Sequence, residues 1–313
     1  MSAYDDARRA YDGKTKPRGS LGRLEDLGSR LAGIRGFVPE RLDAAIVVAA
    51  GDHGVAAEGV SAYPQEVTAQ MVANFAAGGA AINVLARQAG ARLLIEDRGV
   101  GIGTRNMTHG PAMTPDEVQR ELAAGGAIVD ELDVDVVGLG EMGIANTTSA
   151  SALTAALLVV DPVLVCGRGT GLDDDGVAHK VDVVRRALAV NGGTDPLTSL
   201  GGFEIAFLAG VVLGCERKHV AVLLDGFITG AAALAAARIS PSAVDVMIAS
   251  HRSPEPGHAL VLEALGLDPV LDLGLRLGEG SGAALALPLL HASVAILAEM
   301  ATFGDAGVTD AGR

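Results

Sequence analysis

One glutamate near the carboxyl-terminal end has the surroundings of a general base. Glu279 lies between two glycines in the string LGEGSG, and from Leu273 to Leu290 the only other charged residue is Arg276. Because burial disfavours a charged carboxylate, its pKa should be raised, which suits a group that accepts a proton near neutral pH. A carboxylate at this point can equally cap the helix that follows, and the sequence leaves both interpretations open.

A glycine-rich string earlier in the chain has the composition of an anion-binding loop. In CGRGTG (166–171) the glycines allow backbone N–H groups to turn toward a ligand, and the helix expected to begin near Gly176 adds the partial positive charge of its first turn. Arg168 and Lys180 supply full positive charges. The string lacks the GK[ST] ending of a P-loop. The alternative is an ordinary loop with Lys180 solvated on its helix.

A second glycine string formally matches a dinucleotide-binding fingerprint. Gly138, Gly140 and Gly143 have GxGxxG spacing after a predicted strand, but a chain with 42 glycines produces this spacing easily by chance. Glu141 stands where a pyrophosphate would approach, and the acid expected about 20 residues later could only be Asp161. A nicotinamide-dependent oxidoreductase is therefore kept only as an alternative.

The seven histidines raise the question of a metal site. The candidate ligands are Asp52, His53, Asp225, His251 and His258. No two of them have the HExxH spacing or another tight ligand spacing. We therefore predict neither a metal ion nor another cofactor.

Short β-branched, apolar runs predict the strands that must position these residues. Each run is followed by a polar, glycine-containing turn and an Ala-rich helical stretch, a pattern typical of a parallel α/β sheet. Ligands of such sheets bind beyond the carboxyl ends of the strands, where these turns lie. The predicted strands are Ala45–Ala50, Leu93–Ile95, Val134–Leu139, Val220–Leu224 and Val244–Ala249, with Val163–Val165 and Val270–Leu273 as weaker candidates.

The composition excludes several functional classes. With 49% apolar and 20% charged residues, the 313-residue chain can bury a core and is not intrinsically disordered. Its net charge of −14 argues against a nucleic-acid backbone or an anionic membrane as the main partner. Cys166 and Cys215 lack a CxxC spacing and are expected to be buried thiols.

Helices without partner strands are predicted at both ends of the chain. They are Leu21–Ile34, with Ser20 as a possible N-cap, and Ser281–Thr302, whose apolar stretch is broken by Pro288 and polar residues and so favours a buried helix over a membrane span. We predict that residues 1–35 and 280–313 form a small helical domain beside a large α/β nucleotide-binding domain of residues 36–279. No apolar signal segment is visible at the start, so we expect a cytoplasmic protein.

Several long strings resemble the nicotinate-nucleotide:dimethylbenzimidazole phosphoribosyltransferase family. The resemblance covers nearly the whole chain in the family's order. The strings are KTKPRGSLGRLEDL (14–27), GDHGVAAEGVSAYPQEVTAQMVANFAAGGAAINVLAR (51–87), GEMGIANTTSASAL (140–153), CGRGTGLDDDGVAHKV (166–181), GGFEIAFLAG (201–210), LDGFITGAAAL (224–234), SHRSPEPGH (250–258) and LRLGEGSGAALALPLLHA (275–292).

The resemblance implies transfer of phosphoribose from nicotinate mononucleotide to 5,6-dimethylbenzimidazole, which yields α-ribazole 5′-phosphate and nicotinate in the synthesis of the lower ligand of cobalamin. It implies a parallel Rossmann-like sheet with helices on both faces, a small helical domain from both termini, and a homodimer. Two alternatives stay open. One is transfer to another azole, a purine or a phenolic acceptor, and the other is a non-catalytic nucleotide-binding homologue.

The resemblance also assigns site residues. By this mapping Glu279 is the base that accepts the proton as C1′ inverts, and Glu141 is a second catalytic carboxylate. The residues mapped to substrate binding are Gln70 in the base pocket, Gly143, Asn146, Thr147, Arg168, Gly169, Thr170, Gly171 and Lys180 around the phosphate and ribose, and Asp225, Ser250 and Ser253 in nearby turns.

Two positions depart from the family pattern or vary within it. Ala145 stands where the family has Gly in GIGNTT, which adds a methyl group beside the phosphate turn. Ala62 and Tyr63, before Pro64, belong to a stretch that can shape the base pocket. The acceptor base is therefore the part of the assignment that the sequence leaves open, together with the dimer interface and any sharing of the site between subunits.

Overall fold

A five-stranded, all-parallel sheet forms the centre of the computed structural model, which describes residues 2–310. The strand order is β2-β1-β3-β4-β5, so β1 pairs with both β2 and β3. The α/β class is confirmed, and each of the five main predicted runs contributes a strand. The strands are β1 (Ala44–Ala50), β2 (Arg92–Asp97), β3 (Val136–Met142), β4 (Ala221–Leu224) and β5 (Met247–Ala249).

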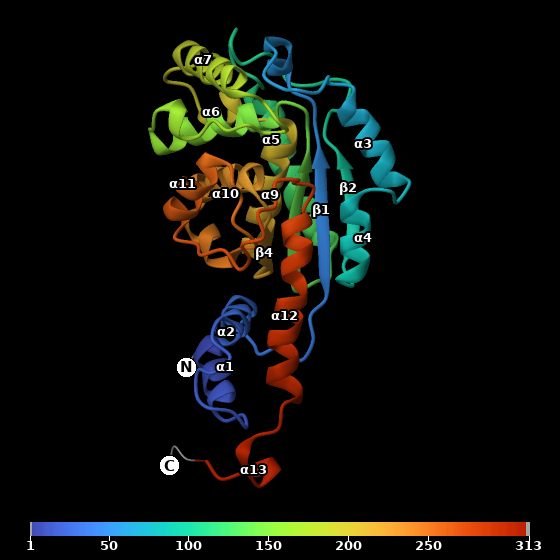
Figure 1. The fold of residues 1–313 in the computed structure, drawn as a ribbon, viewed down its shortest axis with the longest axis vertical. Coiled ribbons are helices and arrows are strands. Elements are labelled where there is room, and N and C mark those ends of the chain that lie inside the picture. Colours follow the sequence, from blue (N-terminus) through green and yellow to red (C-terminus); the bar gives the residue numbers. More distant parts are fainter. Residues whose placement is uncertain (1, 311–313) are drawn as a thin grey trace.

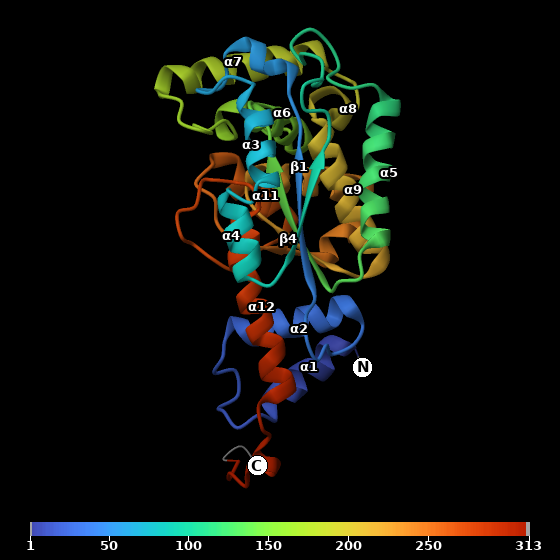
Figure 2. The same ribbon diagram turned by 90° about the vertical axis from the view of Figure 1, so that its right-hand side faces the viewer.

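Helices cover both faces of this sheet. In Figure 2, α3, α4 and α12 lie on one side of the strands, and α5 and α9 lie on the other. The helices are α1 (Ala3–Asp12), α2 (Arg23–Arg35), α3 (Val67–Ala76), α4 (Ala81–Gln88), α5 (Pro115–Glu131), α6 (Asn146–Leu158), α7 (Asp174–Val190), α8 (Pro196–Leu200), α9 (Phe203–Lys218), α10 (Phe227–Ile239), α11 (Pro256–Leu265), α12 (Ser281–Glu299) and α13 (Phe303–Ala306), with 3₁₀ turns η1 (Gly54–Glu58), η2 (Pro162–Leu164) and η3 (Pro241–Val246).

The order of the strands predicts a crevice at the carboxyl ends of the neighbouring strands β1 and β3. The chain leaves β1 toward β2 through α3 and α4, and it returns through α5 to β3 on the other side of β1. At such a reversal the two connections diverge from the carboxyl ends of the neighbouring strands, and ligands of open parallel sheets bind there. β1 is apolar and buried along its whole length, and β3 is buried up to Glu141, so the core holds both strands in place.

The helices of the two termini pack together at the opposite end of the molecule (Figure 1). Ala7 and Tyr11 of α1 form a buried cluster with Ala32 of α2 and Leu297 of α12. The Tyr11 hydroxyl donates to the carbonyl of Ser293 at 2.7 Å. One continuous helix, α12, joins this cluster to the sheet, since it also packs against β1 and β3. The division into two domains stays a prediction.

Three sequence expectations about local structure were wrong. Residues 163–165 do not form a strand because Asp161 caps a 3₁₀ turn that begins at Pro162. The run at 270–273 makes only one isolated bridge, between Leu271 and His251. The N-cap of α2 is Gly22 with φ +54°, and not Ser20.

Two helical stretches of the described chain, Val67–Gln88 and Ser281–Glu299, are long and apolar enough to cross a membrane by length and composition. Core helices of soluble proteins pass the same test, and α12 buries Leu287, Leu290 and Val294 inside the protein. The packing of α12 therefore agrees with the predicted buried helix. Cys166 and Cys215 are both buried and free, as expected.

Candidate functional site

The candidate site lies at the carboxyl ends of β3, β4 and β5. A cavity of about 100 Å³ opens there, and a second cavity of about 460 Å³ shares Gly169, Glu255 and Arg276 with it. Most of the residues that the sequence analysis assigned to the site line one of these two cavities. Those in the first are Glu141, Gly143, Asn146, Thr147, Gly169, Thr170 and Ser253, and those in the second are Arg168, Gly169 and Gly171.

Five assigned residues do not line either cavity. Lys180 and Glu279 are buried next to lining residues, since Lys180 donates to Thr147 and Glu279 follows Gly278 in the chain. Ser250 is fully buried, and its hydroxyl faces the carbonyl of Asp225 at 3.4 Å. Gln70 is exposed on α3. Asp225 turns away from the cavity toward α12.

Glu279 occupies a strained turn immediately before α12. Its φ is +63°, and its neighbours Gly278 and Gly280 have φ of +82° and +85°. A left-handed conformation costs a residue with a Cβ on the order of 1–2 kcal/mol and persists only where the surroundings hold it. A Cβ on Gly140 of β3 would collide with the Glu279 carbonyl, so this glycine lets the turn lie directly against the sheet.

The Glu279 side chain is arranged to accept a proton. It is 6% exposed, and the amide N–H of Ile82 at the start of α4 donates to its carboxylate. Oε2 is buried and has no hydrogen-bond partner in the described part of the chain. Burial raises the pKa of Glu279, and the nearby charge of Asp225 raises it further. Glu279 does not cap α12, so the capping interpretation of this residue is wrong.

Glu141 is the second buried carboxylate and belongs to β3 itself, not to the turn after it. Asn146 Nδ2 donates to its Oε2, and a Cβ on Gly278 would collide with its Oε1. Burial raises the pKa of Glu141 to about 8, while the Asn146 hydrogen bond opposes the shift and the charges of Asp225, Glu204 and Glu279 add to it. Glu141 therefore lines the cavity as an acid that holds its proton at neutral pH.

Lys180 of α7 lies fully buried beneath the glycine loop. Its Nζ donates to Thr147 Oγ1 at 2.8 Å and to the carbonyl of Gly167 at 3.3 Å. Burial lowers its pKa, and the charge of Glu255 opposes that shift. An ammonium has three N–H donors, so these two bonds leave one of them unused. The alternative of a solvated Lys180 is wrong, because its side chain is 0% exposed.

The start of α7 is not open to a ligand in the way the sequence suggested. Asp173 is its N-cap, and the carboxylate accepts the N–H of Gly176 at 2.9 Å. Arg168 pairs with Asp174 and donates to the carbonyl of Leu172. Arg168 therefore lines the second cavity with its charge already paired to Asp174, and Lys180 places a second positive charge beneath the loop.

Ala145, where the resemblance in the sequence led us to expect glycine, adopts a backbone conformation that favours glycine. Its φ is +72°, a left-handed conformation, and the residue is 4% exposed in the turn between β3 and α6. Replacing Ala145 by Gly removes the strain, although glycine gains entropy in the unfolded chain. We expect Ala145→Gly to raise the free energy of unfolding by about 0.5–1 kcal/mol. Denaturant titration measures this, and a lower stability of the variant would contradict it.

Three titratable residues that line the first cavity were not assigned to substrate binding or catalysis by the sequence analysis. They are His251, Glu255 and Arg276. Glu255 is the N-cap residue of α11, but its Oε1 accepts the N–H of Gly169 at 2.9 Å instead of capping that helix. For His251 and Glu255 the signal was the polar string SHRSPEPGH after β5, although the pattern does not tell which of its side chains face the cavity, and Arg276 lies in the string that contains Glu279.

The remaining metal candidates are engaged with other groups. His53 Nε2 lies 2.7 Å from Glu204 Oε1, and both side chains are buried. Asp52 Oδ2 accepts the N–H of Gly101 at 2.7 Å. Within residues 2–310 no group of three or more His, Cys, Asp or Glu side chains is placed to hold a metal ion.

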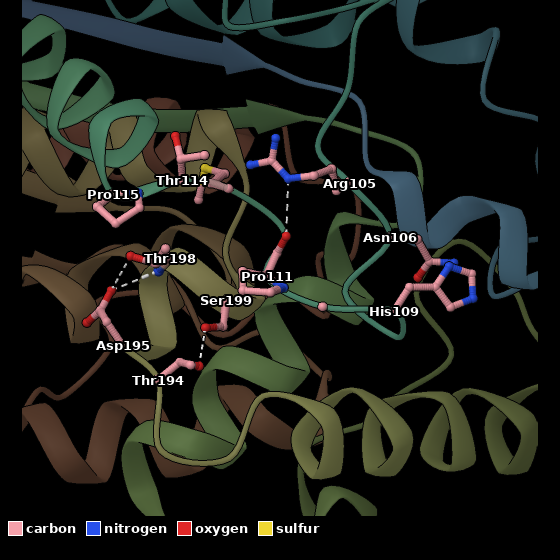
Figure 3. A pocket seen from close by; sticks show the side chains of 12 residues that line it. Arg105, Asn106, His109, Pro111, Thr114, Pro115, Thr194, Asp195, Thr198 and Ser199 are labelled. Atoms are coloured by element: carbon pink, nitrogen blue, oxygen red, sulfur yellow. Dashed lines mark hydrogen bonds between the residues drawn. The ribbon is translucent and has the colours of Figure 1, made fainter.

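Another cavity, of about 910 Å³, lies elsewhere and is lined by none of the assigned residues. Figure 3 shows that its polar side chains bond mainly to one another or to the backbone. Thr194 and Ser199 share a hydrogen bond, Asp195 caps α8 through Thr198, and Arg105 pairs with Glu117. This cavity therefore offers little of the unpaired polar chemistry found beside Glu141.

Comparison with known proteins points to one family. A family profile described as "Phosphoribosyltransferase" matches residues 1–308. The chain is 51% identical to the nicotinate-nucleotide–dimethylbenzimidazole phosphoribosyltransferase of Desulforudis audaxviator, over 99% of this chain and 95% of the relative. It is 50% identical to the protein of the same name from Chloroflexus aggregans, over 97% and 93%. The crystal structure of CobT from Thermus thermophilus matches with a TM-score of 0.93 at 47% identity, over 98% of this chain and 99% of that chain.

Proposed function

Because this chain belongs to the nicotinate-nucleotide–dimethylbenzimidazole phosphoribosyltransferase family, we propose that it transfers phosphoribose from nicotinate mononucleotide to 5,6-dimethylbenzimidazole. The products are nicotinate and α-ribazole 5′-phosphate, the nucleotide of the lower ligand of cobalamin. The protein is an enzyme, a pentosyltransferase. The GxGxxG spacing no longer supports an oxidoreductase, because Gly138 and Gly140 lie inside β3 and not in a turn that a pyrophosphate could enter.

The reaction needs one proton acceptor. One nitrogen of the benzimidazole attacks C1′ of the ribose while the bond from C1′ to the pyridinium nitrogen breaks. The electron pair of that bond goes to the pyridine ring, so nicotinate leaves neutral at its ring nitrogen and requires no general acid. The N–H proton of the acceptor passes to a base, and attack opposite the leaving ring converts the β to the α configuration.

The observation that carries the proposal is the free oxygen of Glu279. Its Oε2 is buried and without a partner in the described structure, while the Ile82 amide holds the carboxylate from the other side. A buried polar atom without a partner is costly unless a ligand supplies one. The N–H of an azole acceptor fits this requirement, so we assign the role of general base to Glu279.

Glu141 is assigned to the sugar. The transition state of such a displacement has oxocarbenium character, with positive charge on C1′ and the ring oxygen. The ionised form of Glu141, which the positive charge of the bound pyridinium favours over the protonated acid, stabilises that charge electrostatically at the cavity wall. The Asn146 amide, which donates to Glu141, orients the carboxylate toward this task.

Lys180 is assigned to the phosphate of the donor. Within the described chain its buried ammonium donates to Thr147 Oγ1 and to the carbonyl of Gly167, and we assign its remaining N–H to an oxygen of the phosphate. Lys180→Met is expected to raise the KM for nicotinate mononucleotide about 10- to 100-fold with a smaller change in kcat, because a hydrogen bond to a charged group contributes about 1.5–3 kcal/mol.

Steady-state kinetics with varied donor measure this effect. Lys218→Met is the matched control, because Lys218 donates to backbone carbonyls of Val129, Asp130 and Leu132, far along the chain from the glycine loop. An unchanged donor KM in Lys180→Met would place the phosphate elsewhere.

The direct test of the function is a product assay. Purified protein is incubated with nicotinate mononucleotide and 5,6-dimethylbenzimidazole in the absence of added metal, and the ribotide and nicotinate are detected by mass spectrometry. Parallel reactions with adenine, benzimidazole and p-cresol define the acceptor. Absence of ribotide with every acceptor, at donor concentrations that saturate binding, would refute the activity and favour a nucleotide-binding role.

The proposal includes a cytoplasmic homodimer. α1 and α2 lie at the end of the molecule opposite the carboxyl ends of the strands, together with the carboxyl-terminal half of α12 (Figure 1). Light scattering of the purified protein measures the oligomeric state.

A further inference from the structure

We propose that Asp225 is a positioning residue that holds the Glu279 turn in its reactive geometry, and that it does not contact the substrates. This inference rests on the proposed function of Glu279 as the base. Sequence resemblance placed Asp225 among the substrate-binding residues, but its neighbours Gly226 and Phe227 line the cavity and Asp225 does not.

The Asp225 carboxylate caps a helix that begins much later in the chain. Its Oδ2 accepts the N–H of Gly280 at 3.2 Å, and its Oδ1 accepts the N–H groups of Gly282 at 2.6 Å and Ala283 at 3.2 Å. The N-cap residue of α12 is Gly280, which has no side chain to perform this role. Because the first N–H groups of a helix have no intrahelical partner and carry partial positive charge, a buried carboxylate is well matched to them.

The surroundings leave Asp225 little freedom. Its side chain is 1% exposed, and His251 Nε2 lies 3.6 Å from its Oδ1. A Cβ on Gly282 would collide with the His251 ring and would come within 2.8 Å of Asp225 Oδ1. Glycine is therefore the only residue type at position 282 that lets the side chains of Asp225 and His251 come this close to the backbone. The hydrogen bonds of Asp225 then hold the end of β4 against the start of α12.

The turn that carries Glu279 needs such an anchor. Three consecutive residues, Gly278, Glu279 and Gly280, have positive φ, and two of them are glycines with wide conformational freedom. The bond from Gly280 to Asp225 acts on the residue next to Glu279. Since a displacement of about 1 Å at a reacting group can cost about 10²-fold in rate, loosening this turn should reduce turnover without affecting how the donor binds.

Asp225→Asn tests the inference by separating kcat from KM. Asn keeps one oxygen, which can accept the N–H groups of Gly282 and Ala283, but its N–H₂ group then faces the N–H of Gly280, so the turn loses the bond next to Glu279. We expect kcat to fall at least about tenfold, with the KM for nicotinate mononucleotide within about threefold of the wild-type value. Calorimetric binding of the donor shows that the variant is folded. The matched control is Asp195→Asn, which changes a helix-capping carboxylate remote from Glu279 and should keep the wild-type kcat.

The pH dependence of kcat in Asp225→Asn distinguishes a positioning role from a loss of stability, because a loss of stability alone would not shift it. The groups around the turn are Glu141 from β3, Asp225 from the end of β4, His251 from the end of β5 and the Ile82 amide from α4. The charge of Asp225 raises the pKa of both Glu279 and Glu141, so its removal should shift the acidic limb of kcat to lower pH whichever of the two carboxylates sets it.

If Asp225→Asn does not fold, Gly282→Ala serves as the second variant, because its methyl group displaces Asp225 and His251 while the carboxylate is kept. The same loss of kcat with unchanged donor binding is expected. A wild-type kcat in the folded variant would overturn the inference. If Glu279→Gln loses activity while the Asp225 variant keeps the wild-type kcat, only this inference fails and the proposed function stands. If Glu279→Gln also keeps the wild-type turnover, the assignment of Glu279 as the base fails as well.

Discussion

Replacing Glu279 by Gln is expected to lower kcat by about 10²–10⁴-fold, while the KM for the donor stays close to the wild-type value. Gln keeps the volume of the side chain and an oxygen for the Ile82 amide, but it cannot accept the proton of the attacking azole. Steady-state and single-turnover kinetics with 5,6-dimethylbenzimidazole measure the loss. Binding of nicotinate mononucleotide by calorimetry shows whether the site is intact.

Glu299→Gln is the matched control for this experiment. Glu299 stands at the other end of the same helix and is exposed, so its substitution changes the net charge equally without touching the site. We expect it to have wild-type turnover. If Glu279→Gln also turned over at the wild-type rate, another group would have to accept the proton and the assigned mechanism would fail.

Glu141 is expected to impose a pH dependence on the reaction. Burial raises its pKa to about 8, so at lower pH it is protonated and cannot stabilise the positive charge that develops on the ribose. The ratio kcat/KM should therefore rise with pH and level off above about 8, because this ratio reports the free enzyme. In kcat the same limb should lie at lower pH, since the bound pyridinium favours the ionised carboxylate.

Glu141→Gln should remove this limb and lower kcat/KM by about 10²-fold. Stability gives an independent check. The pKa of the folded protein lies above the ordinary value of 4.5, so the folded state binds the proton more tightly and loses stability as the pH rises from about 4.5 to about 8. The melting temperature of the wild type should fall relative to that of Glu141→Gln over this range. A parallel pH dependence of the two proteins would contradict the assigned shift.

Much of the fold follows from local pattern. The β-branched runs predicted all five strands, because a strand buried on both faces reads as a continuous apolar segment. The runs at 163–165 and 270–273 show the limit of that pattern. Val163 lies in a turn that Asp161 and Pro162 impose, and Leu271 finds only one bridging partner, His251. A strand needs a neighbour as well as a suitable composition, and local sequence does not show the neighbour.

The sequence alone determined that polar turns follow the carboxyl ends of the strands of a parallel sheet. Its long motif-containing segments determined the family. It identified Glu141, Glu279 and Lys180 as site residues, but not their protonation, their burial or the direction of their side chains. Only the tertiary structure decided that Glu141 sits within a strand as a protonated acid, that Lys180 is buried behind Thr147, and that Asp225 faces α12 instead of the cavity. The physical reason is that burial, and hydrogen bonds between residues far apart in the chain, fix the protonation and direction of a side chain, and these arise only when distant elements pack.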